Sequence, residues 1–309
     1  MIKRTLYFGN PAYLSLNNAQ LQLRLPEIEK NETLPETYKK EVKASIPVED
    51  IGIVMLDHKQ ITVTQALLEA LLENNVAVIT CDSTHHPSGL LLPLSGNTIQ
   101  NERFRAQLDA TEPLKKQLWA QTVMQKIKNQ AILFEMRKLN HSYLVPLHKN
   151  VKSGDSDNCE ATAAVYYWQT IFKQVNGFVR HREGPAPNNY LNYGYAILRA
   201  TMARSIVAAG LLPTLGIFHR NRYNAFCLAD DLMEPYRPYV DEIVYSMIKE
   251  FELVQELQKE HKAVLLKIPA IDVVIDGEKS PLMIATQRTA VSLVKCFEGS
   301  QRKLVYPEI

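Results

Sequence analysis

The spacing of apolar residues changes once along this 309-residue chain, and that change constrains its fold more than any other feature. Up to about residue 95, apolar residues form short runs separated by polar, proline or glycine residues, which is typical of β-strands. Beyond residue 103 they recur at every third or fourth position, which is typical of amphipathic helices. The clearest examples are RTLYFG, ASIPVEDIGIVMLD and VAVITCD for strands, and residues 103–139, CEATAAVYYWQTIFKQV and NYLNYGYAILRATMARSIVAAG for helices.

These patterns predict an α+β protein with two domains. A small β-rich domain covers residues 1–95 and includes one short amphipathic helix, TQALLEALLENN. Residues 96–102 read as a linker, because serine, glycine and asparagine interrupt the pattern there. A larger all-α domain covers residues 103–309, and a turn at Asp276-Gly277 precedes its last helix. A chain of this length can bury a core in each domain.

Composition excludes several classes of protein. The chain opens with MIKRTLYFGNPAYLSL, which lacks the apolar core of a signal peptide. Its longest apolar tract is interrupted by Arg204 and Pro213 and is therefore no membrane span. The four cysteines form no CxxC pair, which argues against a zinc site and a disulfide framework: Cys81, Cys159, Cys227 and Cys296. We therefore expect a cytoplasmic protein without a membrane partner.

Positive charge is concentrated in the helical part of the chain. Residues 1–99 carry a net charge of −3, whereas residues 100–309 carry +5. Basic patches of this kind suit a polyanion such as nucleic acid, although each one alone also fits a solvated helix face. The patches comprise Lys115, Lys116, Lys126 and Lys128; Arg137 and Lys138; FVRHREG; Arg199 and Arg204; and Arg220 and Arg222.

A histidine and three acids lie close together in FHRNRYNAFCLADDLMEPYRPYVDEI, residues 218–243. Asp231 and Glu234 are three residues apart, so in a helix they share one face with Cβ atoms about 5–6 Å apart. His219 can reach them across a short loop. Two carboxylates and an imidazole suit Mn²⁺ or Mg²⁺. A solvated helix start, where the helix dipole favours acids, explains the same pattern.

Glu160 opens a predicted helix after the loop KNVKSGDSDN. Asp157 lies three residues before it, so the two form a possible capping box, with Asp157 at the N-cap and Glu160 reaching back. That arrangement gives Glu160 a complete structural reason to be there. A functional role for Glu160 needs support from outside this segment.

The stretch HREGPAPNNYLNYGYAILRA, residues 181–200, crowds tyrosines around a glycine. Gly194 within a helix costs about 1 kcal/mol relative to alanine, so another backbone or a ligand is expected to approach it closely. Tyr195 suits core packing, while a tyrosine beside Arg199 can also contact bases or phosphates. The chain contains no glycine-rich phosphate loop, GxSxG elbow or HExxH motif.

Taken in order, several of these stretches resemble one family. CEATAAVYYW, PNNYLNYGYAILRA and LGIFHRNRYNAFCLADDLMEPYRPYVD are similar to the signature segments of the CRISPR-associated adaptation integrase, and VMLDHKQITVTQALLEALLENNVAVITCD resembles the end of its N-terminal domain. The wording of FCLADD and YGYAILRA is most like the branch that accompanies the large RNA-guided nucleases. The resemblance covers nearly the whole chain.

The resemblance implies a site and a reaction. A glutamate that opens a helix, a distant histidine and a closing acidic element fall on Glu160, His219 and Glu234, the implied catalytic residues and ligands of Mg²⁺ or Mn²⁺. Asp231 is implied as a supporting or alternative ligand, and Asp230 does not fit the spacing. The implied reaction is attack by the 3′-hydroxyl of a short DNA duplex on a phosphodiester at the border of a CRISPR repeat.

The resemblance also implies partners. These are double-stranded DNA, a second copy of the chain joined through the β-rich domain, a small second adaptation protein whose dimer is flanked by two such dimers, and the RNA-guided nuclease of the same prokaryotic system. Among the basic and aromatic residues, we expect DNA contacts from Arg199, Arg204, Arg220, Arg222 and Tyr195.

Two other functions fit the same residues. A metal-dependent nuclease or resolvase on branched DNA differs only in using water in place of a DNA 3′-hydroxyl. A DNA-bridging scaffold would need a degenerate site, and the intact Glu160, His219 and Glu234 count against it.

Overall fold

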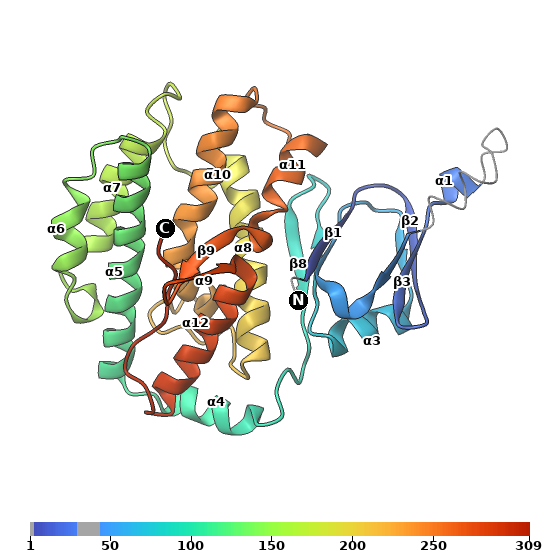
Figure 1. Ribbon diagram of the computed structural model, residues 1–309, viewed down its shortest axis with the longest axis horizontal. Coiled ribbons are helices and arrows are strands. Elements are labelled where there is room, and N and C mark those ends of the chain that lie inside the picture. Colours follow the sequence, from blue (N-terminus) through green and yellow to red (C-terminus); the bar gives the residue numbers. More distant parts are fainter. Residues whose placement is uncertain (1–2, 30–43) are drawn as a thin grey trace. The chain divides into compact units, whose positions relative to one another are not determined.

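The structure, a computed structural model, describes residues 3–29 and 44–309. Its internal contacts divide the chain into two compact units, with the boundary between Leu94 and Ser95. Figure 1 shows strands dominating the first unit and helices dominating the second. Each unit has its own core and is described separately.

The first unit contains two four-stranded sheets. In one sheet the order is β1-β5-β7-β8; β1, β5 and β7 run parallel and β8 runs antiparallel to β7. In the other the order is β4-β3-β2-β6, with β2 parallel to β6 and antiparallel to β3. The strands are β1 (Arg4–Phe8), β2 (Ala12–Asn17), β3 (Gln20–Arg24), β4 (Ser45–Pro47), β5 (Ile51–Leu56), β6 (Ile61–Val63), β7 (Ala77–Cys81) and β8 (Pro87–Leu91).

Apolar residues from both sheets and from one helix form the core of this unit. Helix α3 (Gln65–Glu73) buries Leu67 and Leu71, which lie among Leu14, Leu21 and Ile51. The unit also contains α1 (Pro26–Glu29) and the short 3₁₀ helix η1 (Val48–Asp50). Burying this apolar surface stabilises the unit at about 25 cal/mol per Å². The predicted β-rich N-terminal domain is confirmed, and α3 corresponds to the amphipathic helix predicted in TQALLEALLENN.

The second unit is built around α8 (Asn188–Ala208), of whose 21 residues 17 are buried. It packs against α9, α10, α11 and α12. Nearly every face of this helix is covered, and Figure 1 shows it running beside α10. The others are α4 (Gln100–Asp109), α5 (Glu112–Met136), α6 (Leu144–Lys149), α7 (Cys159–Ile171), α9 (Cys227–Met233), α10 (Arg237–Glu250), α11 (Lys259–Leu265) and α12 (Leu282–Phe297), with 3₁₀ helices η2 (Ser153–Asp155), η3 (Glu234–Tyr236) and η4 (Ile268–Ala270).

The prediction that this unit is entirely helical is wrong. Strands β9 (Asp272–Ile275) and β10 (Glu278–Pro281) form an antiparallel hairpin. Its turn is the predicted Asp276-Gly277, where both residues have positive φ, as a tight hairpin turn requires. Strand β9 has four residues, of which Val273 and Ile275 are buried. An alternation this short is not recognisable in the sequence between helical segments. None of the described helices combines the length and apolar character that a membrane crossing needs.

The segment predicted as a linker is bound to the second unit. The Asn97 side-chain amide donates to the carbonyl of Ala208 over 3.0 Å, and helix α4 already begins at Gln100. Gly96 lies so close to Val207 that a Cβ there would be 2.5 Å from the Val207 carbonyl oxygen. Residues 96–102 therefore have a defined structure: they contact the end of α8 and continue into α4.

Gly194 marks the closest approach of other helices to α8. A Cβ on Gly194 would lie 2.5 Å from Cγ1 of Val240 in α10, and 3.3 Å from Cδ1 of Ile268 in η4. Both neighbours are completely buried, and Val240 is β-branched and therefore stiff. The prediction that a backbone or a ligand approaches Gly194 is wrong, because the nearest atoms belong to packed side chains.

We expect Gly194→Ala to destabilise the protein although alanine favours helix by about 1 kcal/mol. Overpacking against Val240 should cost about 1–3 kcal/mol, and thermal unfolding measures the difference. Adding Val240→Ala to the same chain should recover part of the loss, because the clashing methyl group is then absent. Simple additivity of the two substitutions would contradict the packing explanation.

Candidate metal centre

Helix α7 is capped by Asp155, and the predicted capping box between Asp157 and Glu160 does not form. Asp155 Oδ1 accepts from the Cys159 amide over 2.9 Å, and Asp155 Oδ2 accepts from the Glu160 amide over 3.0 Å. Asn158 is left-handed, with φ of 52°, and this lets the chain turn back so that Asp155 reaches the helix start. Asp157 instead pairs with Lys152. The Glu160 side chain therefore has no capping role.

The carboxylate of Glu160 is directed at Lys126 of α5. Lys126 Nζ lies 2.7 Å from Glu160 Oε1 and 2.6 Å from Glu234 Oε2, so one ammonium bridges two acids from α7 and η3. Burial alone lowers the pKa of Lys126, but the negative charges of Glu234 and Glu160 outweigh it and raise the pKa. Lys126 is thus charged in the folded protein.

Glu234 is 7% exposed and is paired at both oxygens. Arg237 Nε donates to Glu234 Oε1 over 2.7 Å. Burial alone would raise the pKa of Glu234, but the charges of Arg237 and Lys126 outweigh it and the pKa is lowered. Lys126 Nζ lies 2.6 Å from Glu234 Oε2, so the second oxygen is held in an ion pair. Glu234 is therefore a buried carboxylate whose charge is balanced by two cations.

Asn129 fixes η3 against α5. Its buried side-chain amide donates to the carbonyl of Pro235 over 2.8 Å and to the carbonyl of Pro307 over 3.0 Å. Asn129 lies one helical turn beyond Lys126, and Pro235 follows Glu234. The separation of Lys126 and Glu234 is therefore set by a backbone hydrogen bond as well as by their charges.

His219 lies in the loop before α9 and is held by Asp231. Its Nδ1 is 2.5 Å from Asp231 Oδ1, and the same carboxylate accepts the amides of Phe218 and His219 over 2.9 and 3.2 Å. The hydrogen bond to Asp231 raises the pKa of His219, and the charges of Glu234 and Glu160 add to this. Burial raises the pKa of Asp231 and outweighs its hydrogen bonds, which lower the pKa. Asp231 thus orients the imidazole and leaves Nε2 for another partner.

Two neighbours fix this loop. Gly216 lies so close to Asp231 that a Cβ would be 2.7 Å from Oδ2, and 2.4 Å from the His219 carbonyl oxygen. Trp119 of α5 stacks on Phe218 with ring centroids 4.3 Å apart and meets His219 edge-on at 5.5 Å. The imidazole is therefore positioned by α5 and α9 together.

The donor set suits a divalent ion in its chemistry. Glu160, His219 and Glu234 supply two carboxylates and an imidazole, the set expected for Mn²⁺ or Mg²⁺. Glu160 Oε1 and Glu234 Oε2 already converge on one cation, the ammonium group of Lys126. Within residues 3–29 and 44–309, no three His, Cys, Asp or Glu side chains lie close enough together to hold a metal ion. The structure brings Glu160 and Glu234 together through Lys126.

The residues expected to contact DNA fall into two groups. Arg204 and Tyr195 are each 7% exposed, and Tyr195 donates to buried Asp241, so both side chains face the protein interior. Arg199, Arg220 and Arg222 reach solvent. Arg199 pairs with Asp230 through two hydrogen bonds of 2.6 and 3.0 Å, which accounts for that acid.

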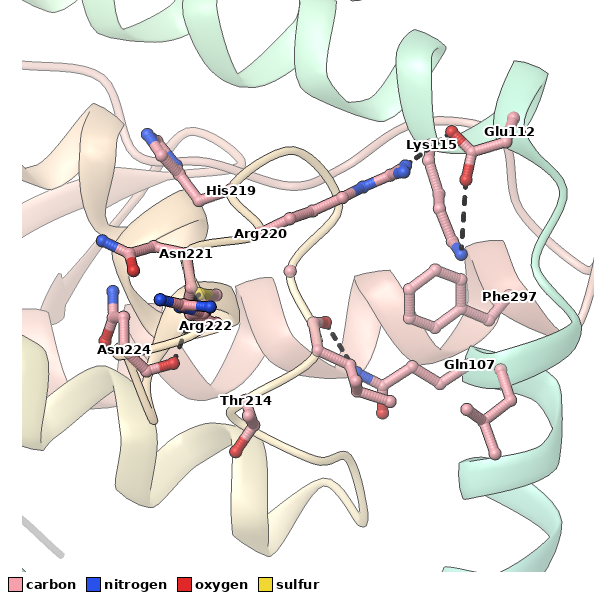
Figure 2. Close-up of a pocket in the computed structure, with 14 residues that line it drawn as sticks. Gln107, Glu112, Lys115, Thr214, His219, Arg220, Asn221, Arg222, Asn224 and Phe297 are labelled. Carbon is pink, nitrogen blue, oxygen red and sulfur yellow. Dashed lines mark hydrogen bonds and ion pairs between the residues drawn. The ribbon is translucent and has the colours of Figure 1, made fainter.

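A recess of about 410 Å³ opens beside His219 (Figure 2). Loop residues His219, Arg220 and Arg222 line it, together with Lys115 and Glu112 from the start of α5. Arg220 reaches across to Glu112, with 2.6 Å between Nη2 and Oε2. Three cations around one recess favour an anionic ligand next to the imidazole.

Sequence reasoning missed Lys126 and Arg237 as parts of the centre. Lys126 appeared in a basic patch of α5, where nothing separated it from Lys128, which pairs with Glu308. Arg237 follows Glu234 at the i,i+3 spacing of helical ion pairs, which was a usable signal.

Comparison with known proteins identifies the family. The model of the family described as CRISPR associated protein Cas1 matches residues 27–277, which places the chain among the CRISPR-associated proteins. A relative from Neisseria meningitidis serogroup C, named CRISPR-associated endonuclease Cas1, is 36% identical over 268 residues, 86% of this chain and 87% of the relative. The chain belongs to the Cas1 family. The resemblance drawn from its signature segments is confirmed.

Solved structures share the fold. A casposase bound to integration product superimposes with a TM-score of 0.75 at 20% identity, covering 98% of this chain and 92% of that one. A chain of a Cas6-RT-Cas1–Cas2 complex gives 0.74 at 19% identity and covers 100% of this chain and 37% of that one. At these identities the likeness shows the fold alone.

Measurements of unfolding free energy can distinguish an acid that caps α7 from an acid that is free to bind a ligand. Asp155→Ala should lower the free energy of unfolding by about 1–2 kcal/mol, because two amides lose their acceptor. Glu160→Gln keeps a side-chain oxygen that accepts from Lys126. This variant should change the free energy of unfolding by no more than about 1 kcal/mol. Denaturant unfolding of both variants measures this. A larger loss for Glu160→Gln would return the capping role to Glu160.

Buried Asp241 should make stability depend on pH. Tyr167 and Tyr195 donate to its two oxygens, and burial raises its pKa to about 6. Since the unfolded carboxyl titrates near pH 4, the folded state binds the proton more tightly, and the free energy of unfolding falls as pH rises from about 4 to 6. Asp241→Asn cannot ionise, so relative to wild type it should gain up to about 3 kcal/mol across that window. If the free energy of unfolding had the same pH dependence in both proteins, titration of Asp241 would be excluded as its cause.

Proposed function

We propose that this protein is a metal-dependent DNA integrase and endonuclease of CRISPR adaptation, which joins 3′-hydroxyl ends of short foreign duplexes to the CRISPR repeat. The observation that carries the proposal is the pairing of Glu160 with Glu234. Two glutamates from separate helices share one cation, and neither has a role in capping its helix. Membership of the Cas1 family and the name endonuclease of its Neisseria relative support the same chemistry.

The centre would hold Mg²⁺ or Mn²⁺ through Glu160, Glu234 and Nε2 of His219. When bound, such an ion lowers the pKa of a hydroxyl and neutralises charge that develops on a phosphate. Arg237 donates to Glu234 Oε1, so Oε2, which now faces Lys126, would be the oxygen that holds the ion. In a neutral His219, Asp231 would hold the ring proton at Nδ1, so that Nε2 would be the nitrogen that binds the ion.

In the proposed reaction one phosphodiester is exchanged for another. The 3′-oxygen of the incoming strand forms a bond to the phosphorus of the repeat border, and the bond from that phosphorus to the 3′-oxygen of the flanking strand breaks. The proton leaves the attacking hydroxyl and the departing oxygen gains one. Because no bond to the protein forms, the residues act by positioning and charge.

Exposed arginines would position the DNA. Arg220 and Arg222 line the recess beside His219, and Arg199 lies on α8 next to Asp230. Their guanidinium groups suit phosphate oxygens, and Arg220 is released from Glu112 when a phosphate replaces that carboxylate.

The partners follow from the same proposal. They are double-stranded DNA, a second copy of the chain joined through the β-rich unit, a small second adaptation protein whose dimer lies between two such dimers, and the RNA-guided nuclease of the system. Solved neighbours titled Cas6-RT-Cas1–Cas2 complex and TtCas1-DNA complex support the first and third. Within the described residues, β1 lies at one edge of the first sheet, and an edge strand is where a second chain could add to a sheet.

A nuclease or resolvase that uses water at the same centre is the second candidate, favoured by the word endonuclease in the names of the relatives. The two reactions differ in their products. Transfer to a DNA 3′-hydroxyl conserves the number of phosphodiester bonds, whereas hydrolysis lowers it by one.

The test supplies a labelled duplex with free 3′ ends, a plasmid carrying the repeat, the partner protein and Mn²⁺. We expect the label to become covalently joined to the plasmid, and chelation to prevent it. Glu160→Gln and Glu234→Gln should each reduce joining by more than about 100-fold, since even outer partners of metal ligands are worth 10–100-fold.

The matched control is Glu242→Gln, the same change at a glutamate of α10 that pairs with Arg137. This variant should join the labelled duplex to the plasmid and bind DNA about as well as wild type. Plasmid nicking without joined label would favour the nuclease. Normal joining by Glu160→Gln would remove this glutamate from the centre.

A further inference from the structure

Lys126 occupies the position between two carboxylates that a shared metal ion would take. Its Nζ is 2.7 Å from Glu160 Oε1 and 2.6 Å from Glu234 Oε2. A magnesium ion lies about 2.0–2.1 Å from its oxygen ligands, so a single point between the same two oxygens cannot hold both cations. An ion that binds Glu160 Oε1 and Glu234 Oε2 together must therefore displace the ammonium group.

Lys126 and Arg237 differ in how rigidly they are fixed. Arg237 donates a hydrogen bond to Glu234 Oε1 from its planar guanidinium, whereas Lys126 donates to Glu160 Oε1 and makes an ion pair with Glu234 Oε2 over 2.6 Å. The ammonium group is a point charge on a flexible four-carbon stem, so it can move more easily than the guanidinium. Lys126 is thus the more easily replaced of the two cations.

We propose that Lys126 is the internal counter-cation of the metal centre: it holds Glu160 and Glu234 together in the metal-free protein and withdraws when the ion binds. The inference rests on the metal centre of the proposed function. It assigns Lys126 a positioning role, because two neighbouring carboxylates without a cation repel each other and separate.

The fold provides room for the withdrawal. A recess of about 190 Å³ borders Lys126 and Glu234, and it is lined by polar, aromatic and charged side chains: Gln130, Trp168, Tyr195, Asp241, Arg180 and Arg237. Lysine has a flexible four-carbon stem, so its ammonium can turn into this recess and find polar partners there. Glu234 keeps its orientation meanwhile, because Arg237 and the hydrogen bond from Asn129 to Pro235 do not involve Lys126.

The proposal is tested by measuring Mn²⁺ affinity and metal-free stability of the full-length protein by calorimetry. Lys126→Met removes the competing cation and keeps the apolar stem. We expect the Kd for Mn²⁺ to fall at least about tenfold, which corresponds to about 1.4 kcal/mol. The metal-free melting temperature should fall, and the rise produced by Mn²⁺ should exceed that of wild type.

Two variants control for charge and for folding. Lys128→Met removes a cation from the same helix, where Lys128 pairs with Glu308, and should leave the Kd within about twofold because the screened charge is more distant. Lys126→Arg keeps a cation and should bind Mn²⁺ no more tightly than wild type. If Lys126→Met does not fold, Lys126→Gln takes its place.

The wild-type protein gives a direct measurement that needs no variant to fold. Mg²⁺ should shift the side-chain ammonium resonance of Lys126 in NMR spectra, and shift that of Lys128 much less. An unmoved Lys126 resonance at saturating Mg²⁺ would overturn the proposal.

The outcomes separate this proposal from the proposed function. If wild type binds Mn²⁺ at one site that Glu160→Gln abolishes, and Lys126→Met binds no more tightly, the metal centre stands and the role of Lys126 is wrong. If neither wild type nor any Lys126 variant binds Mn²⁺, the metal centre itself is wrong, and Lys126 is a structural ion pair.

Discussion

The helical unit depends on the neutralisation of two glutamates that its fold brings together. Glu160 and Glu234 are 22% and 7% exposed, and their charges would repel each other in an interior that screens poorly. Lys126 and Arg237 balance them, so the group is neutral as a whole. The protein can therefore fold around these acids before any ion is present, unlike small domains whose folding requires the metal.

Stability and chemistry are assigned to different residues along the same short segments. Asp155 caps α7, and Glu160 one turn later carries the carboxylate that faces Lys126. Asp231 fixes the loop and the imidazole, while His219 keeps one ring nitrogen free for a ligand. Acids a few residues apart in the sequence therefore differ in burial and in hydrogen-bond partners. Burial and hydrogen bonding decide which of them can bind an ion.

Most of the architecture could be predicted from the sequence, and the polar details could not. Apolar periodicity identified the β-rich unit and the long helices, because it depends on local spacing. The β9–β10 hairpin escaped because four-residue strands give too little pattern. Asp157 was chosen as the cap on spacing alone, and the left-handed Asn158 made Asp155 the partner instead. Lys126 could not be distinguished from Lys128, because only the tertiary fold shows which faces the acids.

The hydrogen bonds of Asn129 bear on when activity can appear during folding. The residues of the centre come from α5, α7, the loop before α9 and η3, and Asn129 ties two of these to Pro307, 178 residues further along the chain. Contacts of such sequence separation form late, after their closure entropy has been offset by the rest of the core. A partly folded or clipped chain therefore lacks the arrangement around Glu160 and Glu234. Assembly of the centre therefore requires that the chain has folded as far as Pro307.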